Sequence, residues 1–419
     1  MRRGLKAAAV LCALALVGAA CSSSKKSTAT ATTAGGSATT AAAATGQDIV
    51  VEGIASKSSH PGSDTGFQAR ITRFNNDGGV AGRKIKFLGV QDDGADSSKD
   101  LTEVQSLVLK DHVFAVAPVA STQFLAPSGD FLVQQKVPVL GYGSVPSFCF
   151  SEWAFGYAGC QQNPKFNTTQ GPEMVQKATG IKLADQRVAI EGLSLQAAVT
   201  ANNMAAGTFT KLGATVVYNK NEVPLSGSGV DFTPFVQGIL ASKPNVVFEV
   251  TDLPNSVALA SALKAGGYKG VIFNGTGYLP GEIGSQPNLA AALDSTYVIV
   301  QAPAQEDQTP AIKQEQADLK AIGASTNIEL GTDIGYWTAD MFIGMLKATA
   351  AKGPITQQSF HDVVNAGLTL NPDIKGGNGP LVWPDYETKP MPCGAFVQAQ
   401  GNHYVSSVQY GCYSIISLP

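Results

Sequence analysis

The alternation of short apolar runs with helical patterns, from residue 48 onward, is the feature that most constrains the fold. Between the first two runs, Phe67, Ile71 and Phe74 recur at helical spacing. The apolar runs that predict strands cover residues 49–54, 84–91, 113–117 and 137–140 in a first series, and 187–191, 215–219, 246–250, 270–273 and 297–300 in a second. Strands that alternate with helices form parallel sheets through right-handed crossovers. The sequence therefore predicts an α/β fold with two doubly wound parallel sheets.

Other parts of the chain predict helices, a loop and a hairpin. The further helical patterns cover residues 121–134, 310–322, 332–351 and 356–366. Residues 141–170 contain Gly, Pro and Cys without a clear period, and we expect a long loop that crosses between domains. Two strand-like runs, 395–400 and 404–410, predict a hairpin near the end of the chain.

The first 20 residues are typical of an export signal. Arg2, Arg3 and Lys6 precede an apolar run and three small residues, and Cys21 follows directly. This order resembles a bacterial lipobox and predicts that Cys21 is acylated; a plain secretory signal with an incidental cysteine is the alternative. Residues 22–47 are almost wholly Ser, Thr, Ala and Gly and predict a flexible tether. We expect an exported protein, lipid-anchored to the outer face of the cytoplasmic membrane, without a transmembrane helix.

The cysteines predict two disulfides. Of the six, one leaves with the signal and Cys21 takes the lipid, so that four remain and three pairings are possible. Cys393 and Cys412 are placed symmetrically about the predicted hairpin turn, and Cys149 lies near Cys160 in the predicted loop. We therefore predict Cys149 with Cys160 and Cys393 with Cys412. No Cys-x-x-Cys or paired His provides zinc-ligand spacing, so we expect no metal site.

Charge and motifs exclude several functions. With 29 Lys and Arg against 32 Asp and Glu, the net charge of −3 does not favour nucleic-acid binding. The chain has no Gly-x-Ser-x-Gly, no His-Glu-x-x-His and no phosphate loop. We expect no catalytic residues and no cofactor, and an exported hydrolase stays a minor alternative.

Several stretches carry a family resemblance. They are residues 75–82 (NNDGGVAG), 91–93 (QDD), 113–117 (VFAVA), Gly335–Tyr336 at the opening of a long helix, and 379–381 (GPL). In this order they resemble the type I periplasmic-binding-protein family, in its leucine/isoleucine/valine-binding branch. The resemblance implies a monomeric substrate-binding protein that captures a small-molecule solute for an ABC permease. A sensor domain that signals through a partner protein is the alternative.

The resemblance also implies two discontinuous lobes joined by a three-strand hinge, with the ligand cleft between them. The implied division is 1–20 for the signal, 21–47 for the lipidated cysteine and tether, 48–170 plus 301–376 for lobe 1, and 171–300 plus 377–419 for lobe 2. Ligands of open parallel sheets bind beyond the carboxyl ends of the strands.

The loops at these ends supply the implied ligand-binding residues. They are Ser59, His60, Ser121, Thr122, Gly143, Ser144, Gln196, Asp252, Thr276, Tyr278 and Tyr336. Each has a structural alternative: Ser121, Thr122 and Asp252 also suit helix N-caps, His60 a solvated loop, and Tyr336 ordinary packing.

Two positions depart from amino-acid-binding relatives. Val119 stands where they place a small hydroxyl residue for the α-carboxylate, and Thr276 stands where they place an acid for the ammonium. An unpaired buried ammonium is costly. Amide or urea-like compounds and aromatic or other organic acids are therefore expected as ligands alongside amino acids, whose ammonium would need Asp252 as a replacement acid.

Overall fold

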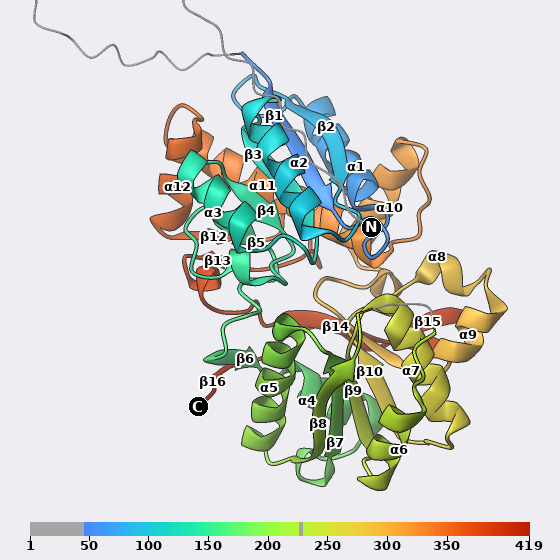
Figure 1. Ribbon diagram of the computed structural model, residues 1–419. Helices are drawn as coiled ribbons and strands as arrows, with labels where there is room; N and C mark the ends of the chain where they lie inside the picture. Colours follow the sequence, from blue (N-terminus) through green and yellow to red (C-terminus); the bar gives the residue numbers. More distant parts are fainter. Residues whose placement is uncertain (1–45, 226–228) are drawn as a thin grey trace, which may run out of the picture. The chain divides into compact units, whose positions relative to one another are not determined.

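The computed structural model describes residues 46–225 and 229–419, and these form two α/β sheets with helices packed on them (Figure 1). The predicted signal, Cys21 and almost all of the tether lie outside the described residues. The predicted fold class is confirmed. No helix in the described part of the chain combines the length and the apolar character needed to cross a membrane.

The first sheet is entirely parallel, with the strand order β2-β1-β3-β4-β5. Its strands are β1 Ile49–Ala55, β2 Ile85–Asp92, β3 Ala115–Ala120, β4 Val139–Gly141 and β5 Ala154–Gly156. All six residues of β3 are buried. Their side chains alternate between two cores: Ala115 and Ala117 belong to one hydrophobic cluster, and Val116 and Val119 to another. The sheet is therefore covered on both faces, as parallel sheets require.

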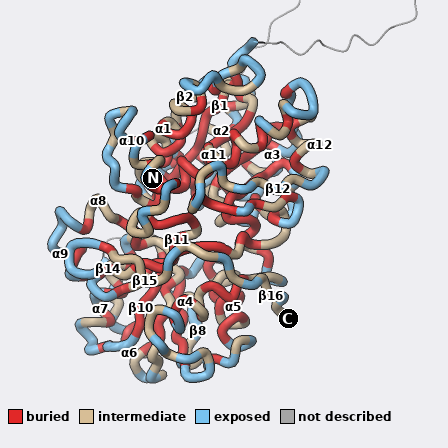
Figure 2. Tube along the Cα trace, turned by 180° about the vertical axis from the view of Figure 1, so that it is seen from behind, coloured by how far each residue is buried: buried red, intermediate tan, exposed pale blue. Residues whose placement is uncertain are grey.

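Helices from distant parts of the chain cover these two faces. They are α1 Ser63–Asn76, α2 Ser97–Leu109, α3 Ala126–Gln135, α10 Pro310–Ala321, α11 Leu330–Ala350 and α12 Gln357–Asn365. Helix α11 is buried over most of its circumference (Figure 2), which is typical of a core helix. It lies against α1 through glycines: a Cβ on Gly66 would stand 1.9 Å from the Thr332 carbonyl oxygen, and one on Gly335 would stand 2.0 Å from that of Ser63.

Three local predictions were wrong. The helix predicted at 121–134 begins at Ala126, because the Ser121 hydroxyl accepts from the Gln123 amide (2.8 Å) and holds the preceding turn outside the helix. The loop predicted at 141–170 contains strand β5 and strand β6, Phe166–Thr168. Tyr336 lies in the second turn of α11, and not at its start.

The second sheet has the order β15-β14-β11-β10-β9-β7-β8. Its strands are β7 Arg187–Leu193, β8 Thr215–Val223, β9 Val246–Val250, β10 Val271–Asn274, β11 Tyr297–Val300, β14 Cys393–Gln400 and β15 His403–Cys412. The first five are parallel, and the predicted hairpin β14–β15 adds to β11 in antiparallel orientation. Its helices are α4 Gln170–Thr179, α5 Gln196–Lys211, α6 Thr233–Ala241, α7 Leu253–Ala265, α8 Pro280–Ile283 and α9 Pro287–Leu293.

Two small antiparallel pairs complete the fold. Strands β12 Leu368–Leu370 and β13 Leu381–Trp383 pair with each other, and β16 Ile415–Ser417 pairs with β6. The end of the chain is thereby tied to a segment that lies far earlier in the sequence.

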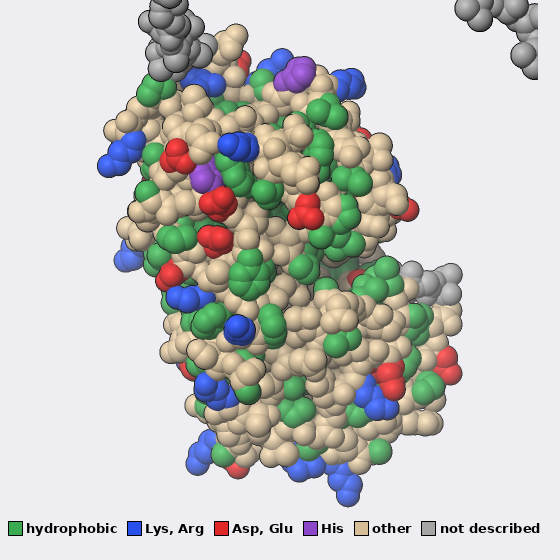
Figure 3. Space-filling model, turned by 60° about the vertical axis from the view of Figure 1, so that its left-hand side comes forward, with side chains coloured by type: hydrophobic (Ala, Val, Ile, Leu, Met, Phe, Trp, Pro, Cys, Tyr) green, Lys and Arg blue, Asp and Glu red, His purple; other side chains and the backbone are tan. Residues whose placement is uncertain are grey.

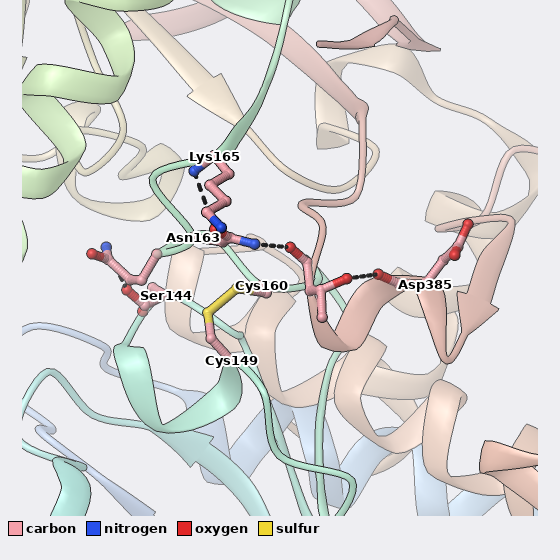
Figure 4. Close-up of a disulfide and its surroundings, with 8 residues drawn as sticks. Ser144, Cys149, Cys160, Asn163, Lys165 and Asp385 are labelled. Atoms are coloured by element: carbon pink, nitrogen blue, oxygen red, sulfur yellow. Dashed lines mark hydrogen bonds between the residues drawn. A yellow bond between two sulfur atoms is a disulfide. The ribbon is translucent and has the colours of Figure 1, made fainter. Parts of the chain in front are cut away.

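Both predicted disulfides are confirmed, Cys149–Cys160 and Cys393–Cys412. Figure 4 shows the first, where the amide of Asn163 donates to the Thr388 carbonyl (2.7 Å). The backbone N–H of Cys160 donates to the Lys389 carbonyl (3.0 Å). These bonds fix the disulfide loop to the segment that follows β13.

Candidate ligand-binding site

The polar loops of both sheets lie at the carboxyl ends of the strands, and a side-chain hydrogen bond joins these two edges. Tyr142, directly after β4, donates its hydroxyl to the side-chain oxygen of Gln301, directly after β11. Tyr278, in the loop after β10, accepts from the backbone N–H of Gln305 (2.9 Å). Figure 3 shows the surface hollowed between the upper and lower parts of the view. The Tyr142–Gln301 bond therefore links the loop after β4 of the first sheet to the segment after β11 of the second.

The first sheet presents a buried hydroxyl–carboxylate cluster. Ser56 after β1 donates to Asp93 after β2 (3.0 Å), and Ser121 after β3 donates to the same carboxylate oxygen. The other oxygen of Asp93 accepts from the Ala95 amide (2.7 Å). Ser56, Asp93 and Ser121 are all buried. Ser121 is thus not an N-cap, and its hydroxyl is engaged within the protein.

His60 lies beside this cluster and is also buried. Burial lowers the pKa of His60 to about 4, although the neighbouring Asp93 charge opposes that shift. The imidazole is therefore neutral at pH 7. Its Nδ1 atom has no hydrogen-bond partner among the described residues and stays available to a donor. The expectation of a solvated loop histidine was wrong, because the loop 56–62 packs against the start of α11 at Gly331.

The second sheet presents a chain of hydroxyl groups. Thr251 after β9 lies 2.8 Å from Ser256, and Ser256 lies 3.1 Å from Thr276 after β10, measured between hydroxyl oxygens. The side-chain oxygen of Asn274 accepts from the amide of Thr276 (3.0 Å) and holds that loop in place. Asp252 caps α7 by accepting from the Asn255 amide (3.0 Å), so its structural alternative, a helix N-cap, is confirmed.

A buried acid, Glu249, lies on β9 next to these hydroxyl groups. Burial raises its pKa well above the ordinary value, and neither carboxyl oxygen has a hydrogen-bond partner among the described residues. This shift favours the protonated, neutral form of Glu249 beside the hydroxyl groups of the second edge.

Two predicted aromatic residues have structural partners. The Tyr278 hydroxyl donates to Glu306 (2.9 Å), and its ring packs edge-to-face on Tyr404. The Tyr336 hydroxyl donates to Asp318 (2.8 Å) and accepts from Arg73 (3.1 Å), on α10 and α1 respectively. Tyr336 is therefore grouped with these helices and not with the loops at the sheet edges.

The remaining predicted residues lie at the edges with different exposure. Thr122 and Gln196 are exposed, and Ser59 and Ser144 are half-buried. Gly143 is buried with φ +98°, and a Cβ there would stand 2.3 Å from the Gly159 carbonyl oxygen. Its role is to permit this close approach.

Several residues at these edges were missed by the sequence reasoning. Tyr142 was detectable, since it directly follows a predicted strand, whereas nothing in the sequence pairs it with Gln301. Two leucines also lie in loops at these edges: Leu125, after β3, is 38% exposed, and Leu195, after β7, is 39% exposed. Large apolar side chains left exposed beside a polar site are candidates for contact with an apolar ligand body.

A family model described as periplasmic binding protein matches residues 50–403. The chain therefore belongs to the periplasmic binding protein family. This confirms the resemblance seen in the sequence. The family consists of substrate-binding proteins rather than enzymes. No curated protein matches the chain.

Solved structures share the fold at low identity. A fatty acid ABC transporter substrate-binding protein from Thermomonospora curvata has a TM-score of 0.70 and 16% identity, over 88% of this chain and 93% of that one. A solute-binding protein of Rhodopseudomonas palustris, in complex with p-hydroxybenzoic acid, has a TM-score of 0.67 and 20% identity over 88% and 98%. A leucine-binding protein from Thermotoga maritima has a TM-score of 0.64 and 13% identity over 88% and 98%.

Proposed function

We propose that this protein captures a small solute between two lobes and delivers it to an ABC permease, without chemical change of the solute. The observation that carries the proposal is the pair of polar edges, Ser56–Asp93–Ser121 and Thr251–Ser256–Thr276, at the carboxyl ends of two parallel sheets. Such edges are where open α/β sheets bind ligands. Membership of the periplasmic binding protein family supports the same function.

The proposed lobes are 48–170 plus 301–376 and 171–300 plus 377–419, with a hinge where the chain crosses three times. Closure would bring the two polar edges around the solute, and the ligand would stabilise the closed state by its differential affinity. The Tyr142–Gln301 contact lies at one crossing, directly after β11, and supports this placement of the hinge.

The site favours a carboxylic acid or an amide with an apolar body over a free α-amino acid. Thr276 supplies a hydroxyl where an ammonium would need an acid, and burial raises the pKa of the neighbouring Glu249, which disfavours a compensating negative charge. Hydroxyl and amide donors suit a carboxylate or carbonyl oxygen. Leu125 and Leu195 are placed to contact the apolar part of such a ligand. The p-hydroxybenzoic acid and fatty acid in the names of two structural neighbours fit this class.

We further propose that the protein is exported and held at the membrane through acylated Cys21, as a monomer on a tether of residues 22–47. The signal-like start of the chain and its Ser-, Thr- and Ala-rich segment support this. A tether of this composition lets the receptor reach a permease while staying at the membrane.

Thermal unfolding with defined solutes tests the function. Benzoate, 4-hydroxybenzoate, octanoate, benzamide and leucine are each titrated while the melting temperature is measured. A solute that binds raises the melting temperature as its concentration increases. At one hundred times the dissociation constant, binding stabilises the folded state by about 2.7 kcal/mol.

A matched pair of variants locates the site. Thr276→Val removes the hydroxyl at the second edge and should weaken binding about tenfold. Thr72→Val on α1 loses a comparable hydroxyl, which bonds to the Gln68 carbonyl at 2.7 Å, and should leave affinity unchanged. If none of the five solutes shifts the melting temperature, solute capture of this class is refuted.

A further inference from the structure

A groove of about 450 Å³ runs between α3 and the loop that carries the Cys149–Cys160 disulfide. Ala126 and Val133 line it from α3, and Pro146 and Phe150 line it from the loop. Val133 is 38% exposed and Phe150 is 65% exposed. The groove therefore presents apolar surface to solvent on the flank of the first sheet.

Phe150 is held in an unfavourable position. Its φ of +59° lies in the left-handed region, which bulky residues rarely adopt. Two bonds hold it there: the neighbouring Cys149 is cross-linked, and the Phe150 N–H donates to the Glu387 carbonyl (2.9 Å). The Phe150 ring buries little apolar surface against the described residues, so burial does not compensate for this backbone strain. Strain of this kind persists where the surroundings impose it, often at binding surfaces.

Carboxylates surround the apolar part of the groove. Asp130, Glu152 and Glu387 line it, and no Lys or Arg belongs to its lining. Burial raises the pKa of Glu387, and the nearby Glu152 charge raises it further. The imidazole of His361 lies 3.4 Å from the Glu152 carboxylate at the rim. Figure 3 shows acidic side chains, together with a basic one, near a histidine on one face of the upper part. A cationic partner side chain would relieve this repulsion.

We propose that this groove is the docking surface for an extracytoplasmic loop of the permease, which places an apolar side chain against Phe150 and a Lys or Arg between Glu152 and Glu387. The inference rests on the proposed function, since it assigns the surface that meets the transport partner. Charge complementarity favours this partner: the chain's own tether, residues 22–47, contains only two lysines, both near its start, and no large apolar residue. Helix α3 begins one residue after Leu125 at the ligand edge, so a partner in the groove contacts the lobe beside the solute.

Photo-crosslinking of the full chain tests the proposal. The chain is co-expressed with the permease and ATPase subunits of an ABC importer from its own host, with Phe150→p-benzoylphenylalanine as the probe. The same replacement at Leu109, which is 61% exposed at the end of α2, is the matched control. We expect a permease adduct from position 150 at least fivefold above that from position 109, mapping to a loop that contains Lys or Arg.

A charge reversal tests the complementarity. Glu152→Lys, combined with the probe at 150, should lower the adduct at least threefold, whereas Asp77→Lys, an exposed acid at the end of α1, should not. Equal adducts from positions 150 and 109, no adduct from 150, or an adduct to a second copy of this chain would each overturn the proposal. The solute-induced melting shift, measured on the same variants, keeps failure of docking distinct from failure of solute capture.

Discussion

Replacing Tyr336 by phenylalanine separates a structural role from a ligand-binding one. The Tyr336 hydroxyl donates to Asp318 (2.8 Å) and accepts from Arg73 (3.1 Å), while Arg73 and Asp318 also pair directly at 2.7 Å. Burial and the charges of Glu315 and Asp318 raise the pKa of Tyr336, so its hydroxyl stays a donor at every physiological pH. Tyr336→Phe thus removes two hydrogen bonds to charged groups and keeps the ion pair.

The expected cost follows from these partners. A hydrogen bond to a charged group contributes about 1.5–3 kcal/mol, and part of the loss is offset because Arg73 and Asp318 still satisfy each other. We expect the free energy of unfolding to fall by about 2 kcal/mol. At about 2–4 °C per kcal/mol for domains of 150–250 residues, the melting temperature should fall by about 4–8 °C.

Urea unfolding and solute titration provide the two readouts. Tyr386→Phe is the matched control, because that buried hydroxyl donates only to the neutral Pro380 carbonyl (3.1 Å) and should cost about 1 kcal/mol. Solute affinity should stay within twofold of wild type in both variants. A tenfold loss of affinity in Tyr336→Phe with unchanged stability would refute this reasoning and place the hydroxyl on the ligand.

Three further outcomes are expected. Removing the second disulfide by Cys393→Ala with Cys412→Ala, which are 19 residues apart, should cost about 3 kcal/mol in urea unfolding. Gly66→Ala would place a Cβ 1.9 Å from a backbone oxygen of α11 and should lower the melting temperature by more than 5 °C, whereas Gly207→Ala, where the nearest atom is 3.4 Å away, should raise it slightly. The pKa of His60 is about 4 in the folded protein, below its ordinary 6.5. The neutral imidazole therefore contributes about 3 kcal/mol to the free energy of unfolding above pH 6.5, and this contribution is lost as the pH falls toward 4. His60→Asn should flatten this pH dependence of stability, measured by urea unfolding from pH 4 to 8.

The strands of both sheets were predictable because buried parallel strands are continuous apolar runs. The run 246–250 coincides with β9, and the run 297–300 coincides with β11. Strand β5 was missed because its three residues, Ala-Phe-Gly, carry no pattern and are defined only by pairing with β4. The hydrophobic period of a segment indicates which of its side chains are buried. It does not indicate which neighbouring strand completes the sheet.

At the candidate site, the sequence predicted which loops take part but not which side chains bond to each other. The loops after β1, β3 and β10 follow from topology alone, so Ser121 and Thr276 were placed at the correct edges. That Ser121 donates to Asp93, 28 residues earlier, depends on two loops meeting in space. Tyr336 was proposed through family resemblance, and its bond to Arg73 spans 263 residues of sequence. Contacts at such separation are fixed by packing and leave no local signal.

The position of α11 in the sequence has a consequence for how the protein folds. The helix packs on β3 and β4 of the first sheet, yet it begins at Leu330, long after β4 ends at Gly141. Helix α1 covers part of the same face, but the part that α11 covers stays exposed during synthesis while the intervening residues are made. Folds dominated by such distant contacts form slowly, and their exposed apolar strands are prone to aggregate. A chain cut short before Leu330 is therefore expected to aggregate more readily than the full chain.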